Sequence, residues 1–160
     1  MARFDKPDGS KEFRPASRNE HGWVLSDPAG SLPLYRLNEI PPTGPVIVTE
    51  GEKCADAAWS IGLPAVTSPH GARSAGKADW SALGGRDVII LPDNDEAGRS
   101  YAAEVARILT SLDPPAQVKV VELPDLPVSG DVVDYLDNQK NVEPERLRAR
   151  ILKLAEAVPK

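Results

Sequence analysis

The sequence predicts an α/β protein: a mostly parallel, four-stranded sheet flanked by helices, with a small β-rich segment on its N-terminal side. Short runs of branched apolar residues, such as 46–48 and 88–91, are typical of buried parallel strands. Helical patterns follow the runs at 46–48 and 88–91, so strands and helices alternate. Parallel strands joined through helices imply right-handed crossovers. A length of 160 residues is enough for one such domain with a small appendage.

The N-terminal segment, residues 1–43, is rich in turn-forming residues and poor in long apolar runs. Its strand-like pieces are 11–14, 22–25 and 32–37. Short strands separated by Pro, Gly, Asn and Asp predict a small antiparallel β-meander.

Basic and aromatic residues are interleaved in this segment. The residues concerned are Arg14, Arg18, Arg36, Trp23 and Tyr35. Such a strip suits single-stranded nucleic acid, because phosphates pair with cations and bases stack on rings. The alternative is a small sheet that buries its aromatic residues and solvates its arginines.

The main domain is predicted over residues 44–138, after the proline-rich junction 41–45. Its expected elements, in order, are a strand at 45–49, a helix at 54–61, and strands at 63–67 and 88–91, then a helix at 96–112 and a strand at 118–123. The final segment, 139–160, carries an amphipathic helix at 144–158. That helix either packs back on the sheet or links the domain to another.

Acidic residues follow three of the predicted strands. They are Glu50, the pair Asp93 and Asp95, and the later pair Asp131 and Asp134. In open α/β sheets, ligands bind at the carboxyl ends of the strands. Crowded carboxylates repel one another, and a hard cation such as Mg²⁺ or Mn²⁺ relieves the repulsion. The alternative for an Asp before a helix, such as Asp95, is that it only caps the helix.

Several cations are candidates for phosphate contacts near this acidic edge. Arg73 and Lys77 lie in a Gly-rich loop that nearly spells the phosphate-binding P-loop, but Ala78 stands where that motif needs Ser or Thr. Lys53 follows the first acidic strand end, and Arg99 lies in the first turn of the helix after Asp95.

Charge is distributed unevenly along the chain. The net charge of −5 divides into zero for residues 1–45, −8 for 46–137 and +3 for 138–160. Bound cations invert the field of an acidic site, so the acidic average is compatible with a nucleic-acid partner. The single Cys54 excludes an intramolecular disulfide and a multi-cysteine zinc site. With no membrane-spanning apolar run and no signal peptide, a cytoplasmic protein without a membrane partner is expected.

Three motifs together resemble the TOPRIM domain of primases, topoisomerases, certain nucleases and recombination mediators. They are Glu50-Gly51 after a strand, Asp93-x-Asp95 followed by Glu-Ala-Gly98, and Gly130-Asp-x-x-Asp134-Tyr-Leu. The wording is most similar to primases and primase-helicases of phages, plasmids and mobile elements. The resemblance covers about residues 44–138. Cys54 departs from it, because an Asp is common at that position.

The resemblance implies a strand order of 2-1-3-4, which brings Glu50 beside Asp93 and Asp95. It implies an enzyme of DNA replication: a primase-type nucleotidyltransferase that uses Mg²⁺ or Mn²⁺, a single-stranded DNA template and nucleotides. Glu50, Asp93 and Asp95 are the expected catalytic residues. Asp93 and Asp95, with help from Asp131 or Asp134, are expected to hold the metal, and Glu50 is expected to act as a metal ligand or as a general acid or base. A helicase or zinc-binding domain, in the same or another chain, is the expected partner. A TOPRIM nuclease and a non-catalytic module that binds nucleic acid or a replication partner remain the alternatives.

Overall fold

The chain divides into two units, Met1–Leu32 and Pro33–Lys160. The computed structural model describes residues 2–14, 16–27 and 30–159. Within its helices and strands, the side chains of residues 2, 3, 11–14, 19, 72 and 73 lie outside this description.

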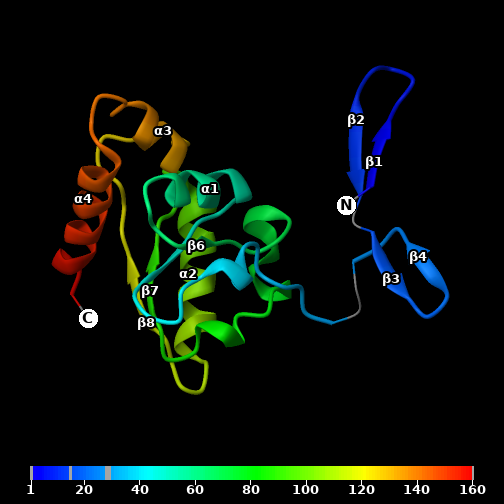
Figure 1. Cartoon of the computed structure of the whole chain (residues 1–160), viewed down its shortest axis with the longest axis horizontal. Helices are drawn as coiled ribbons and strands as arrows, with labels where there is room; N and C mark the ends of the chain where they lie inside the picture. The colour runs from blue at the N-terminus through cyan, green and yellow to red at the C-terminus, as the bar shows by residue number, and fades with distance from the viewer. Residues whose placement is uncertain (1, 15, 28–29, 160) are drawn as a thin grey trace. The chain divides into compact units, whose positions relative to one another are not determined.

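The N-terminal unit contains two separate antiparallel hairpins, drawn in blue in Figure 1. Strand β1 (Ala2–Asp5) pairs with β2 (Lys11–Arg14), and β3 (Ser17–Asn19) pairs with β4 (Gly22–Val24). The β-rich segment is therefore confirmed, but the single meander is wrong, because no strand of one hairpin pairs with a described strand of the other.

The third strand expected for the meander, 32–37, does not form. Pro33 has no backbone N–H to give to a sheet. Tyr35 makes only one isolated bridge, to Thr67, and Arg36 takes a left-handed conformation with φ of 57°. The short 3₁₀ helix η1 (Leu37–Glu39) follows at once.

A four-stranded parallel sheet forms the centre of the second unit, in the order β6-β5-β7-β8. Its strands are β5 (Val46–Val48), β6 (Ala65–Val66), β7 (Asp87–Ile90) and β8 (Gln117–Val120). Numbered along the chain, this is the expected order 2-1-3-4, which is confirmed. The first and third strands are therefore neighbours.

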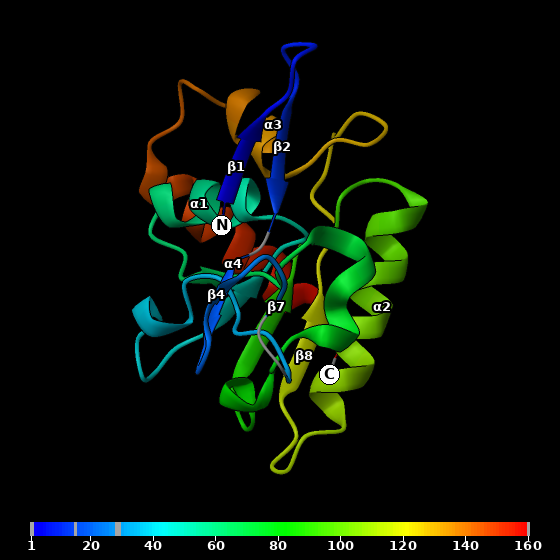
Figure 2. The same cartoon turned by 90° about the vertical axis from the view of Figure 1, so that its right-hand side faces the viewer.

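Side chains of these strands alternate between two apolar cores, because successive residues of a strand point to opposite faces. Ile47 and Ile89 face a core shared with α1 (Glu52–Ser60), α3 (Val132–Asp137) and α4 (Pro144–Ala157). Val48 and Ile90 face the other core, shared with α2 (Glu96–Thr110). The second unit is thus a three-layer sandwich, with α2 beside β7 and β8 in Figure 2.

The last helix, α4, packs on the sheet. Its buried residues Leu147, Ile151 and Ala155 belong to the same core as Ile47. Of the two interpretations open for this segment, packing back on the sheet is the one that the structure shows. No helix of the described residues is long and apolar enough to span a membrane.

The Gly-rich stretch expected as a loop is instead the 3₁₀ helix η2 (Gly71–Lys77), and the short η3 (Ser81–Leu83) follows it. Buried Ala75 contributes to the core on the α2 side. The indole Nε1 of buried Trp80 donates a hydrogen bond of 2.8 Å to the carbonyl oxygen of Ala75. The side chain of Trp80, five residues after Ala75, therefore holds this stretch against the domain.

Candidate active site

The carboxyl ends of β5 and β7 bring Glu50 and Asp93 to the same edge of the sheet. Val48 and Ile90 are paired in register, and the Leu91 amide donates to the Val48 carbonyl oxygen at 2.9 Å. Glu50 lies two residues beyond Val48, and Asp93 lies three beyond Ile90. Two acids that are 43 positions apart in sequence therefore leave adjacent strands at nearly the same level.

Each of these two carboxylates has a buried oxygen without a hydrogen-bond partner: Oε2 of Glu50 and Oδ1 of Asp93. Burial raises the pKa of Asp93 to about 7, and the negative charges of Glu50, Asp131, Asp95 and Asp134 contribute to that rise. Burial also raises the pKa of Glu50, with the charge of Asp95 as the second cause. An unpaired acceptor in a desolvated, negatively charged site is costly, and a proton or a cation relieves that cost.

Asp95 has a different role, because its side chain caps helix α2. Its Oδ1 accepts a hydrogen bond of 2.8 Å from the Gly98 amide. This bond is the first cause that lowers the pKa of Asp95, so this carboxylate is held ionised. The capping interpretation of Asp95 is therefore the geometry that the structure shows, while Asp93 caps no helix.

Asp131 and Asp134 form a capping box at the start of α3. Oδ1 of Asp131 accepts from the amides of Val133 and Asp134 at 2.7 and 3.0 Å, and Oδ2 of Asp134 accepts from the Asp131 amide at 3.0 Å. Their charges still act on Asp93. The five predicted acids thus meet at one edge, where three of them stabilise helix ends.

Asn94 ties the two acidic loops together, a role that the sequence analysis missed. Its amide donates to the Gly130 carbonyl oxygen at 2.8 Å, and its carbonyl oxygen accepts from the Ser129 amide at 3.0 Å. Its side-chain Nδ2 donates to the carbonyl oxygens of Leu126 and Pro127 at 3.0 and 2.9 Å. The sequence signal for this role is an Asn between two Asp residues.

Gly98 allows helix α2 to approach the end of β7 closely. A Cβ atom at this position would overlap the Asp93 carbonyl oxygen and lie 2.8 Å from the Asp93 nitrogen. Both of these atoms belong to the backbone, which cannot rotate away. The Gly of the Glu-Ala-Gly98 motif is therefore a packing requirement of the acidic edge.

Cys54 also belongs to this region. It is buried in α1, and burial together with the charges of Asp131 and Asp93 raises the pKa of its thiol to about 12. The thiol is therefore held protonated, and its hydrogen bond with Asp131 contributes to the shift. A neutral S–H therefore lies next to the carboxylate of Asp131.

No group of three or more His, Cys, Asp and Glu side chains in the described part of the chain is arranged so that it could hold a metal ion. What the structure offers is a pair, Glu50 and Asp93, with two partnerless oxygens. Mg²⁺ keeps several waters and is commonly bound through one or two carboxylates together with substrate phosphates. The donor chemistry therefore fits a divalent cation that substrate helps to bind.

The predicted cations are distributed over the structure. Arg99 lines a hollow of about 120 Å³ that is also lined by Asp93, and its side chain is exposed. Lys53 and Lys77 are exposed as well. The side chain of Arg73 lies outside the described residues.

Two further candidates, Arg14 and Arg18, belong to the N-terminal unit, on β2 and β3. Arg18 is exposed, and the side chain of Arg14 lies outside the described residues. Nucleic-acid binding by all these cations stays a prediction.

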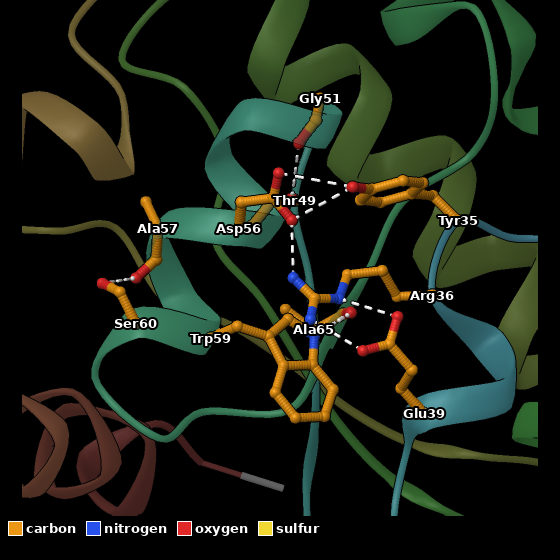
Figure 3. Close-up of polar contacts among 10 residues, drawn as sticks. All are labelled: Tyr35, Arg36, Glu39, Thr49, Gly51, Asp56, Ala57, Trp59, Ser60 and Ala65. Carbon is orange, nitrogen blue, oxygen red and sulfur yellow. Dashed lines mark hydrogen bonds and ion pairs between the residues drawn. The ribbon is translucent and has the colours of Figure 1, made fainter.

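Arg36 lies in the second unit and is held by ion pairs (Figure 3). Its Nη1 lies 2.6 Å from Oδ1 of Asp56, and its Nη2 lies 2.7 Å from Oε2 of Glu39. The guanidinium also stacks over Trp59, 4.7 Å from the ring centroid. The Tyr35 hydroxyl donates to the same Asp56 carboxylate at 3.1 Å. We call these five residues the Arg36 cluster.

The fold and the edge together define a parallel α/β domain with acidic residues at the carboxyl ends of two adjacent central strands. This is the fold of phage primase domains. The crystal structure of the primase fragment of bacteriophage T7 primase-helicase matches with a TM-score of 0.57 and 22% identity, over 86% of this chain and 56% of that one.

A second T7 structure contains the lagging-strand DNA polymerase interacting with primase domains bound to an RNA/DNA hybrid and dTTP. It matches with a TM-score of 0.57 and 21% identity, over 89% of this chain and 69% of the matched chain. No protein-family model and no curated protein sequence matches the chain. At these identities, the comparisons show that the fold is shared.

Proposed function

We propose that this chain is a TOPRIM-type catalytic domain that acts on nucleic acid with Mg²⁺ or Mn²⁺, in primase-type nucleotidyl transfer during DNA replication. One observation carries the proposal: Glu50 and Asp93 hold partnerless buried oxygens at adjacent strand ends, and the pKa of each carboxylate is raised. The fold shared with T7 primase domains supports the choice of reaction.

In this proposal, the metal is held by Asp93 and Glu50, with Asp95, Asp131 and Asp134 contributing negative charge. A divalent ion in such a site neutralises phosphate charge and aligns the attacking and leaving oxygens. The protein's own contribution is position: four hydrogen bonds hold Asn94 next to Asp93, and Gly98 lets helix α2 pack against the Asp93 backbone. Arg99, on the rim of the hollow beside Asp93, is placed to pair with a nucleotide phosphate.

The proposed substrates are a single-stranded DNA template and nucleotides. A helicase or a zinc-binding domain, in the same or another chain, is the proposed partner. TOPRIM nuclease activity would use the same residues, with water in place of a primer 3′-hydroxyl.

Two observations favour another candidate, a non-catalytic binding module. Among the described residues, no three ligand side chains are arranged to hold a metal ion. In addition, the protonated thiol of Cys54 stands where primase-like sequences commonly have an Asp. A module of this kind would keep the fold and bind nucleic acid without turnover.

Incubation of the chain with single-stranded DNA, labelled nucleotides and Mn²⁺ separates these functions. Primase activity yields new oligonucleotides, nuclease activity yields fragments of the DNA, and the binding module yields neither. Glu50→Gln and Asp93→Asn should each abolish either product. Asp87→Asn is the matched control, since Asp87 is an exposed acid at the opposite end of the same strand β7. Product formation by both site variants at the parent rate would disprove the assignment.

A further inference from the structure

A groove lies between α3, α4 and the chain that follows β8. Its volume is about 650 Å³, within the range of ligand-binding clefts. Tyr135 from α3 and Leu154 and Ala157 from α4 give it apolar walls, and Pro124 lines its side toward the sheet. Asn138, Arg150 and Lys153 add polar groups.

This groove adjoins the hollow beside Asp93. The exposed Asp125 lines both, so the two depressions lie on either side of one short turn. Asp125 has a φ of 60°, the left-handed conformation of a tight turn. A linear polymer that is bound at Asp93 and crosses this turn therefore enters the groove.

The cations of the groove come from one helix. Arg150 and Lys153 lie on α4, three residues apart and hence on one face of the helix, and both are exposed. Nη1 of Arg150 donates to Oε1 of Gln139 at 2.5 Å, which holds the guanidinium toward the groove. Asp125 is the acidic residue among the groove's lining residues, so the two cations outnumber it.

The distribution of charge along the chain also favours an anionic ligand in this groove. Residues 46–137 carry a net −8, whereas residues 138–160 carry +3. A polyanion that approaches the acidic edge is repelled by most of the domain and attracted by its C-terminal helix. An acidic peptide would meet the same two cations, but the continuity with the hollow at Asp93 favours a strand that also reaches the proposed reaction centre.

We propose that this groove holds the backbone of single-stranded nucleic acid as the strand leaves the acidic edge. Arg150 and Lys153 bind its phosphates, and Pro124, Leu154 and Ala157 offer apolar surface to its bases. The inference rests on the proposed function, because it takes the edge at Asp93 as the place where the strand is engaged.

The test is the salt dependence of binding of thymidylate oligonucleotides, a dodecamer and a trimer, measured by fluorescence anisotropy in Mn²⁺. The variant Arg150→Gln with Lys153→Gln should weaken binding of the dodecamer. It should also lower the salt slope by about 1.4, because each phosphate that the protein no longer neutralises lowers it by about 0.7. The trimer, with only two internucleotide phosphates, is the short comparison, and its binding should change little.

Arg107→Gln with Arg148→Gln is the matched control. It removes the same total charge, but Arg107 lies on α2, and Arg148 lies against Gly62 rather than in the groove. Arg150→Lys with Lys153→Arg keeps the charge and should retain the parent slope. Circular dichroism checks that each variant folds. If the double glutamine variant does not fold, the single variant Lys153→Glu takes its place in the binding measurements.

Four outcomes decide the matter. Weaker binding confined to the dodecamer and to the groove variant supports the proposal. Equal binding by the groove variant and the control overturns the groove and leaves the proposed function standing. So does a groove variant that loses binding of oligoglutamate but binds the dodecamer as the parent does, because the groove would then take an acidic peptide. A parent chain that binds no oligonucleotide overturns both.

Discussion

Two charged regions of the second unit, the Arg36 cluster and the acidic edge, are built in opposite ways. In the Arg36 cluster, one guanidinium meets two carboxylates at 2.6 and 2.7 Å and a tyrosine hydroxyl completes the network. At the acidic edge, Glu50 and Asp93 face further acids, and each keeps a buried oxygen without a partner.

The difference teaches how to separate structural charge from functional charge. In the Arg36 cluster, opposite charges satisfy one another and join the chain before β5 to helix α1. At the acidic edge, like charges are held together by the hydrogen bonds of Asn94 and by the close packing that Gly98 allows, so the energy cost stays in the folded protein. Charge that the fold leaves unsatisfied is available for a ligand.

The largest expected effect is on metal binding. Glu50→Gln combined with Asp93→Asn should abolish Mn²⁺ binding in calorimetric titration, because it removes both partnerless oxygens. Arg36→Gln should leave the titration unchanged. Equal Mn²⁺ affinity of the double variant and the parent would remove the distinction drawn between the two regions.

The next effect is on pH-dependent stability without metal. The pKa of Asp93 is raised from 3.8 to about 7, so the folded state binds the proton more tightly than the unfolded state does. Stability should therefore fall as the pH rises from about 4 to about 7, by less than the roughly 4 kcal/mol that three pKa units represent, because solvent screens this half-buried carboxylate. Urea unfolding across this range should show the fall in the parent and a smaller one in Asp93→Asn. An Asp87→Asn control should behave as the parent, and added Mn²⁺ should oppose the fall.

A smaller effect is expected in the Arg36 cluster. Arg36→Gln leaves the carboxylates of Asp56 and Glu39 without their cation and removes the stacking on Trp59. The melting temperature should drop by a few degrees at low salt and by less at high salt, because these carboxylates are about half exposed and salt screens them. Arg36→Lys should recover only part of this stability, since one ammonium cannot pair with both acids in this geometry. A drop that does not depend on salt would show that packing, not charge, holds the cluster.

The smallest expected effect separates the two roles open to Asp95. Asn caps helices about as well as Asp, so Asp95→Asn should unfold at nearly the parent temperature. If Asp95 also contributes to the metal site, the same variant should weaken Mn²⁺ binding. Asp95→Ala removes the cap and should lower the melting temperature, which calorimetry would measure for both variants.

Much of the fold could be predicted from the sequence because its signals are local. Branched runs such as 88–91 and the apolar stripe of α2 fix the type of each element within a few residues. The strand order came from the resemblance, not from periodicity, because no local pattern states which strands are neighbours. The N-terminal hairpins were misjudged as one meander, since pairing beyond a hairpin depends on contacts distant in sequence.

The acidic edge was predictable as a set of residues but not as a set of roles. Asp93 and Asp95 are equivalent in sequence, yet the helix begins at Glu96 and so uses Asp95 as its cap. The 3₁₀ fold of 71–77 was missed for a related reason: Trp80, outside the Gly-rich motif, decides how that stretch packs. Arg36 was grouped with other arginines by charge, whereas its partner Asp56 lies on α1, 20 residues further along the chain.

The four hydrogen bonds of Asn94 have a consequence for the fluctuations of the native protein. Because they join the loop after β7 to the loop before α3, neither loop can leave its position without breaking the bonds of the other. We therefore expect the two loops to share one opening equilibrium, so that hydrogen exchange should report them as a single cooperative unit. We therefore expect Asp93 and Asp131 to be presented together or withdrawn together, in one local unfolding event.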